Sequence, residues 1–155
     1  MRRRRGGFTI VELLTVMIVI GILAGIALLK YIDLRHRART AAVVADLQAV
    51  RLAAYGAYYE TNSWPAQAAP GVVPAGLVEY LPANFSFGKP EYTLEWVNIA
   101  PPGGGPSASM QVYVNVTSAD PRLQRAIEQS LGNKTPYISV GGTLTFIIVG
   151  PDGKA

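Results

Sequence analysis

An uninterrupted apolar run near the N-terminus constrains this 155-residue chain more than any other feature. The residues from Leu13 to Leu29 carry no charge, and the apolar stretch counted from Phe8 is 22 residues long. A helix needs about 20 apolar residues to cross the hydrocarbon core of a bilayer. The run therefore predicts one membrane-spanning segment, residues 8–29, and leaves the rest of the chain for one modest domain.

The charges on either side of the run predict its orientation. Four arginines, Arg2 to Arg5, stand directly before it, and such a cluster favours the cytoplasmic side. Lys30, Arg35, Arg37 and Arg39 follow the run and weaken this bias. Because the leader cluster is compact and adjacent, we expect a single-pass protein with its N-terminus inside and its C-terminal domain outside.

The leader also accounts for the net charge of +4. Removing its four arginines from the 14 basic residues leaves ten, against ten acidic ones. The basic character therefore belongs to the leader, which argues against a nucleic-acid-binding face.

The composition excludes most enzyme classes. There is no cysteine, which rules out a thiol nucleophile, a disulfide framework and a cysteine metal site. The single histidine, His36, is too little for a Ser-His-Asp triad or a multi-histidine metal site. Phosphate-binding glycine motifs and calcium-loop spacings are also missing from the sequence. We expect no catalytic residue, no cofactor and no metal.

Glu12 is the one acid within the apolar stretch. A charged side chain at membrane depth costs about 2.5–3.5 kcal/mol on insertion scales, so it indicates a functional group that needs a partner. The alternative is that Glu12 reaches the headgroups as an interfacial residue. A cleavable secretory or twin-arginine signal fits poorly, because no small-x-small cleavage site follows the run.

The segment Gly6-Gly7-Phe8-Thr9-Ile10-Val11-Glu12-Leu13 resembles the class III signal sequence of type IV pilins and of type II secretion pseudopilins. The resemblance is close over residues 6–35 and holds only in outline beyond them. It implies that a prepilin peptidase removes the leader, residues 1–7, by cutting between Gly7 and Phe8, and that Phe8 becomes N-methylated. It also implies assembly from the bacterial inner membrane into an extracytoplasmic filament, through an assembly platform and with sister pilin subunits or further copies of the chain.

Within this family resemblance, Glu12 gains a partner. Cleavage gives Phe8 an α-ammonium group, and stacked helices can bring Glu12 of one subunit near Phe8 of its neighbour. Such a pair offsets the desolvation of both charges, and it also fixes the axial register of the helices. Many family members carry a proline where this chain has Leu29, and only Gly21 and Gly25 weaken the helix upstream. The difference favours a minor pilin or pseudopilin over a major pilin.

The helical pattern continues beyond the membrane segment. Five apolar residues recur at intervals of three and four, as on one face of a helix: Val43, Leu47, Val50, Ala54 and Tyr58. We expect one helix of about 50 residues from Phe8, whose second half, residues 30–60, packs its apolar stripe against a sheet.

Residues 61–155 are expected to form a loop-and-sheet domain. Tyr55, Tyr58, Tyr59 and Trp64 predict an aromatic cluster where the helix ends. The proline- and glycine-rich stretch 64–90 predicts a long loop with one helical turn at 77–81.

By resemblance to pilins, this loop contacts neighbouring subunits. The candidate contact residues are Trp64, Leu77, Tyr80 and Leu81.

The remaining sequence predicts four strands and a short helix. Asp120 is placed to cap a helix that starts at Pro121 and turns Leu123, Ile127 and Leu131 inward before Gly132. Gly141-Gly142 indicates a tight hairpin. The expected strands are residues 92–99, 110–116, 137–140 and 143–149, with a turn at 101–106. The fold class is α+β, with a long helix on an antiparallel sheet of about four strands.

The sequence thus predicts a non-enzymatic structural subunit of a pilus-like filament or of a secretion pseudopilus, and these two remain open. The rival interpretation is a membrane-anchored binding domain that never polymerises.

Overall fold

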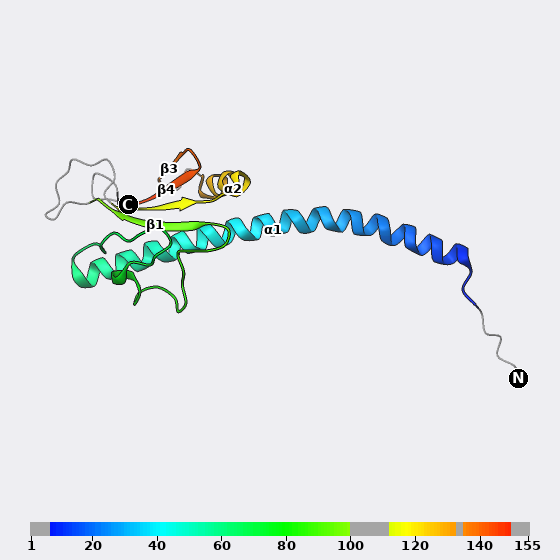
Figure 1. The fold of residues 1–155 in the computed structure, drawn as a ribbon, viewed down its shortest axis with the longest axis horizontal. Helices are drawn as coiled ribbons and strands as arrows, with labels where there is room; N and C mark the ends of the chain where they lie inside the picture. The colour runs from blue at the N-terminus through cyan, green and yellow to red at the C-terminus, as the bar shows by residue number, and fades with distance from the viewer. Residues whose placement is uncertain (1–6, 100–111, 133–134, 150–155) are drawn as a thin grey trace, which may run out of the picture. The chain divides into compact units, whose positions relative to one another are not determined.

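The chain consists of a long N-terminal helix followed by a loop and a small sheet (Figure 1). The structure is a computed structural model that describes residues 7–99, 112–132 and 135–149. It divides into two compact units, residues 1–38 and 39–155. The elements are α1 (Ile10–Thr61), the 3-10 helix η1 (Ala75–Leu77), β1 (Thr93–Asn98), β2 (Val112–Thr117), α2 (Pro121–Leu131), β3 (Tyr137–Val140) and β4 (Thr143–Val149).

The predicted long helix is confirmed, because α1 runs for 52 residues without a break. Gly56 lies within it despite the low helix propensity of glycine. The reason is packing, since a Cβ at Gly56 would come within 3.1 Å of the Tyr80 ring. The glycine therefore gives the loop a close approach to the helix.

The four strands form one antiparallel sheet in the order β1-β2-β4-β3, which confirms the predicted α+β fold. The predicted hairpin joins β3 to β4, and Gly141 and Gly142 have φ angles of 58° and 93°, which favour glycine. Of the strand predicted at 110–116, the first two residues lie outside the described residues, as does the turn predicted at 101–106.

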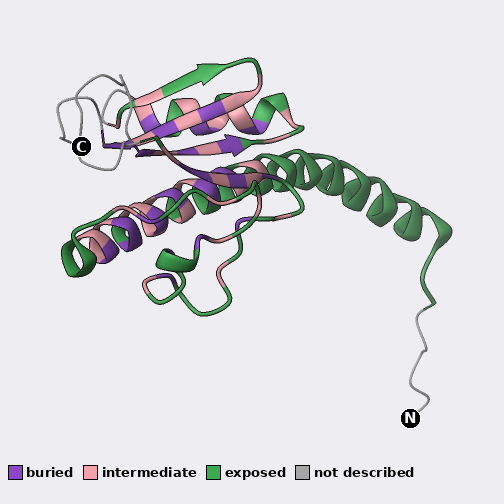
Figure 2. Cartoon of the chain, turned by 60° about the vertical axis from the view of Figure 1, so that its left-hand side comes forward, coloured by how far each residue is buried: buried purple, intermediate pink, exposed green. Residues whose placement is uncertain are grey.

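One face of the sheet forms the core with the second half of α1 and with α2. Figure 2 shows buried residues along the strands and along one side of the helix. Four of the five residues predicted for the helix face are fully buried; the fifth, Tyr58, is half-buried. The buried residues of α1 are Thr40, Val43, Leu47, Val50, Ala53, Ala54 and Ala57.

Helix α2 begins as predicted. The Asp120 carboxylate accepts a hydrogen bond from the Arg122 amide at 2.9 Å, and Pro121 occupies the first turn, where its missing N–H costs nothing. Its inward side, Leu123, Ile127 and Leu131, is buried in the common core.

The long loop between α1 and β1 is held against the outer edge of β1. The Leu94 amide donates to the Phe87 carbonyl, and the Gly71 amide donates to the Leu94 carbonyl, each at 2.8 Å. The indole Nε1 of Trp96 donates to the Pro65 carbonyl at 3.0 Å. The two backbone bonds pair Leu94 on an edge strand that would otherwise present unpaired groups there, and the indole bond ties the start of the loop to the same strand.

Candidate functional site

Helix α1 begins with reciprocal hydrogen bonds between Thr9 and Glu12. The Thr9 amide and the Thr9 hydroxyl donate to Glu12 Oε2, at 2.9 Å and 2.8 Å. The Glu12 amide donates in return to Thr9 Oγ1 at 3.2 Å. This is a capping box, in which a threonine and a glutamate three residues later satisfy backbone donors at the start of a helix. The carboxylate is therefore held at the positive end of the helix dipole.

Sequence reasoning assigned Glu12 to a neighbouring subunit and missed this partner within the chain. The signal was present, since Thr-x-x-Glu directly before an apolar run is the sequence signature of a capping box. Glu12 thus has a hydrogen-bond partner, Thr9, within its own chain. A pairing with a second chain has to compete with the Thr9 contacts.

The Gly7–Phe8 bond lies just outside α1, which begins at Ile10. Both residues are exposed and neither is helical. A Cβ on Gly7 would meet no atom of the described residues within 4 Å. The chain's own packing gives no reason for a glycine at this position.

The apolar segment that follows is exposed on all sides. Every residue from Phe8 to Leu29 is classed as exposed (Figure 2). Among the described residues, α1 is the one helix long and apolar enough to cross a membrane. A helix that is apolar around its whole circumference fits lipid or a helix bundle, because water would solvate it poorly.

Comparison with known proteins places a family motif on this same segment. Residues 2–28 match the model of the prokaryotic N-terminal methylation motif. The chain therefore carries the class III signal peptide that is the signature of type IV pilins and pseudopilins. No curated protein and no solved structure matches the chain.

Two of the four predicted subunit-contact residues, Leu77 and Leu81, lie in the core of the chain. Leu77 is fully buried and Leu81 is 8% exposed, and both belong to the hydrophobic core. The loop turns back onto the domain at η1, where the Leu81 amide donates to the Leu77 carbonyl at 3.1 Å. Their side chains fill the interior of the domain and have little exposed surface.

Trp64 and Tyr80 are half-buried and also make contacts within the chain. The Trp64 ring stacks on Tyr58 with ring centroids 4.4 Å apart, which places it in the predicted aromatic cluster. The Tyr80 hydroxyl donates to the Glu60 carboxylate at 2.5 Å, and this bond is the main reason that the pKa of Tyr80 is raised. In the same cluster Tyr59 is 82% exposed and has the most free surface.

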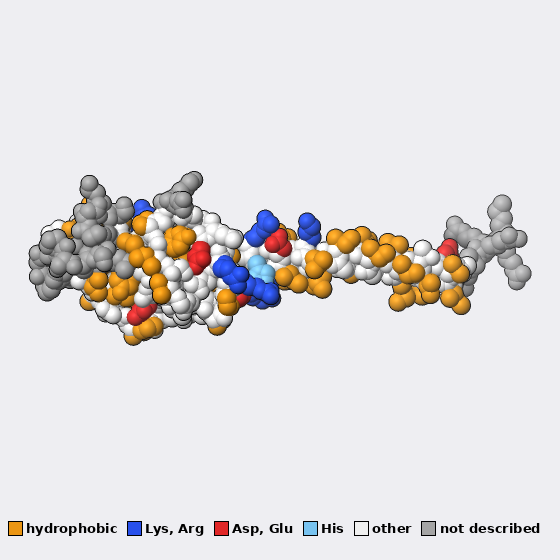
Figure 3. All heavy atoms as spheres, turned by 90° about the horizontal axis from the view of Figure 1, so that it is seen from above, with side chains coloured by type: hydrophobic (Ala, Val, Ile, Leu, Met, Phe, Trp, Pro, Cys, Tyr) orange, Lys and Arg blue, Asp and Glu red, His pale blue; other side chains and the backbone are white. Residues whose placement is uncertain are grey.

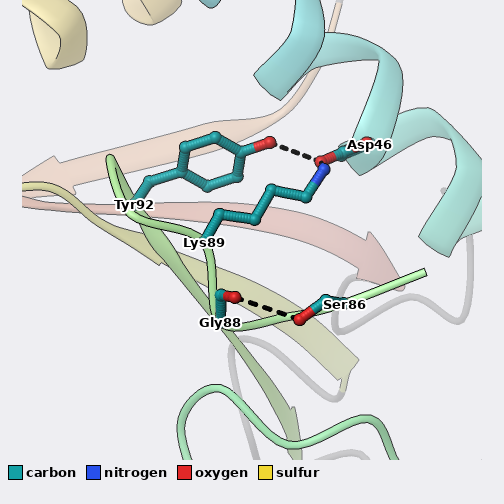
Figure 4. Close-up of polar contacts among 5 residues, drawn as sticks. All are labelled: Asp46, Ser86, Gly88, Lys89 and Tyr92. Atoms are coloured by element: carbon teal, nitrogen blue, oxygen red, sulfur yellow. Dashed lines mark hydrogen bonds and ion pairs between the residues drawn. The ribbon is translucent and has the colours of Figure 1, made fainter. Parts of the chain in front are cut away.

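A half-buried polar cluster joins α1 to the end of the loop (Figure 4). The Asp46 carboxylate accepts hydrogen bonds from the Lys89 ammonium and from the Tyr92 hydroxyl. Burial, together with the bond to Asp46, raises the pKa of Tyr92 well above its usual range. Within the described ranges, no three histidine, aspartate or glutamate side chains gather as metal ligands.

Proposed function

We propose that this chain is a structural subunit of a type IV pilus-like filament or of a type II secretion pseudopilus. In this proposal prepilin peptidase cuts between Gly7 and Phe8, and Phe8 is N-methylated. Residues 8–29 anchor the subunit in the inner membrane, with residues 30–60 and 61–155 outside. The observation that carries the proposal is the methylation motif at residues 2–28, placed at the head of an apolar helix half that is exposed on every side.

Two features of the site support processing at this bond. Residues 7–9 are exposed and non-helical, so a peptidase can reach the Gly7–Phe8 bond without unwinding α1. Packing among the described residues does not require a glycine at position 7. A glycine selected because a peptidase recognises it would show this same lack of contacts.

Assembly follows from the same residues. After cleavage, Phe8 carries an ammonium group four residues before Glu12. Sister subunits that bundle their apolar halves would bring the Phe8 ammonium of one to the Glu12 carboxylate of the next. Pairing reduces the cost of holding both charges in an apolar bundle and fixes the register of the helices.

The first test is the intact mass and N-terminal sequence of the protein from its native membrane. We expect a chain that starts at Phe8 and carries one added methyl group. A chain that still starts at Met1, or that is cut after Leu29, would overturn the proposed processing.

The capping box gives specific support to one rival, a membrane-anchored domain that never polymerises. Because Thr9 already satisfies Glu12, the carboxylate has a role without a neighbour. In that case Glu12→Gln should behave like the wild type, because glutamine also completes a capping box.

Variants at Glu12 and Thr9 separate charge pairing from capping, and the rival predicts no wild-type chain in sheared filaments. The assay compares the amount of subunit in sheared filaments with the amount in alkali-washed membranes. If charge pairing drives assembly, Glu12→Gln and Glu12→Ala both lose filament incorporation while membrane insertion is unchanged. Thr9→Ala keeps the charge and removes only the cap, so it should retain incorporation. Loss in Thr9→Ala and Glu12→Ala, with normal Glu12→Gln, would assign the site to capping alone.

A further inference from the structure

Three basic residues lie on two sides of α1 where its apolar segment ends. Lys30, Arg35 and Arg37, named here the basic collar, are all exposed. At 3.6 residues per turn, Lys30 and Arg37 lie on one side of the helix and Arg35 lies on the other. Figure 3 shows lysine and arginine side chains gathered directly after the apolar surface of the helix. The one acid among residues 30–38 is Asp33.

The collar side chains have no strong ion pair among the described residues. Arg37 contacts Asp33 at 3.0 Å, but the two side chains are 77% and 58% exposed, and such surface pairs are weak. Lys30 and Arg35 make no ion pair among the described residues. Arg39 differs, because it is 26% exposed and pairs with Glu91 at 2.7 Å within the sheet domain.

The position of the collar matches a membrane surface. Residues 10–29 of α1 rise about 30 Å, which matches a hydrocarbon core of roughly 30 Å. The collar extends over a further 10 Å or so of helix, slightly more than the headgroup layer of about 5–8 Å. Tyr31, 62% exposed, lies at its start, where aromatic side chains are enriched at membrane interfaces.

We infer that the basic collar binds the headgroups of anionic phospholipids in the leaflet that faces the sheet domain. This inference rests on the membrane anchoring proposed above. Lysine and arginine side chains next to a spanning helix are attracted to anionic lipid, and their long stems reach the phosphates from several sides of a helix. The collar therefore sets the depth of the subunit in the membrane, and its lipid contacts must break when the subunit is extracted into a filament.

The test uses the full chain in vesicles of phosphatidylcholine with phosphatidylglycerol, and spin-labelled versions of both lipids. Electron paramagnetic resonance then gives the preference of the protein-bound lipid for phosphatidylglycerol. The triple variant Lys30→Gln, Arg35→Gln, Arg37→Gln removes the collar and keeps the leader. The matched control, Arg51→Gln, Arg122→Gln, Arg125→Gln, removes the same charge from the second compact unit, residues 39–155.

We expect the collar variant to lose most of its preference for phosphatidylglycerol. The loss should be about fivefold at low salt if only one of the three cations contributes. The control should keep the preference, and Asp33→Asn should increase it because the one acid of the collar becomes neutral. An unchanged preference in the collar variant, or an equal loss in the control, would overturn the inference. Failure of the wild-type chain to resist alkaline extraction would instead overturn the anchoring, and the collar assignment with it.

Discussion

The two halves of α1 are both rich in apolar residues, yet they are used differently. From Phe8 to Leu29 every side chain is exposed. From Thr40 to Ala57 one stripe is buried beneath the sheet and the other sides of the helix are not. The first half has no partner among the described residues, whereas the second is already satisfied within its own domain. Apolar content therefore does not decide what a helix binds; its distribution around the helix does.

The ion pairs of the two regions differ in the same way. Asp33 and Arg37 form an exposed contact within one helix, whereas Asp46 joins α1 to Lys89 and Tyr92 of the loop and is only 16% exposed. Water and salt screen the attraction between Asp33 and Arg37. The attraction between Asp46 and Lys89 is stronger, because both side chains are partly buried. We expect the two regions to differ in the same way in their contributions to the free energy of unfolding.

The largest effect is expected from equal truncations in the two halves of α1. Leu47→Ala, at a fully buried position, should lower the free energy of unfolding of the sheet domain by about 2–5 kcal/mol. Leu23→Ala, at a position 60% exposed, should change it by less than about 0.5 kcal/mol. Denaturant unfolding in micelles, followed by tryptophan fluorescence, measures this, because Trp64 and Trp96 both lie in the sheet domain. Equal effects of the two variants would contradict the division of α1.

A smaller difference is expected between the two aspartates. Asp46→Ala leaves the Lys89 ammonium and the Tyr92 hydroxyl without their acceptor and should cost about 1–3 kcal/mol. Asp33→Ala should cost no more than about 0.5 kcal/mol, because the pair with Arg37 is open to solvent. The same unfolding assay applies, and a near-neutral Asp46→Ala would show that the cluster adds no stability.

The helix caps should differ by about 1 kcal/mol. Asp120→Ala removes the carboxylate that accepts from the Arg122 amide, so the sheet domain should lose about 1 kcal/mol. Asp120→Asn should retain most of it. Thr9→Ala removes the cap of α1 in the other unit and should leave the unfolding of the sheet domain unchanged. A loss with Thr9→Ala equal to that with Asp120→Ala would show that the two regions unfold together.

The smallest effect concerns alkaline pH. The pKa of Tyr92 is raised in the folded domain, so its protonated form stabilises the fold below the ordinary tyrosine value of about 10. This contribution is lost as the pH rises through the folded-state pKa. The denaturant midpoint should therefore fall as the pH rises above about 10, and by less in Tyr92→Phe. An identical fall in the variant would remove Tyr92 as a source of the pH dependence.

Local sequence patterns determined most of the elements. The helix, the Asp120 cap and the Gly141-Gly142 hairpin depend on residues within a few positions of each other, and all were predicted correctly. The class III signal motif is likewise a short contiguous pattern, and the family model confirms it at residues 2–28. The Thr9–Glu12 capping box is equally local, since both residues lie within four positions of each other, but it was not predicted.

Only the tertiary structure decided how distant segments meet. One example is the strand order β1-β2-β4-β3. Others depend on how the long loop folds back: the burial of Leu77 and Leu81, and the contacts of Asp46 with Lys89 and Tyr92. Proline and glycine mark such a loop but do not give its path, because its position is set by the core it covers and by the edge of β1. The sequence thus determined which segments are helix and which are strand, and long-range packing decided which loop residues remain on the surface.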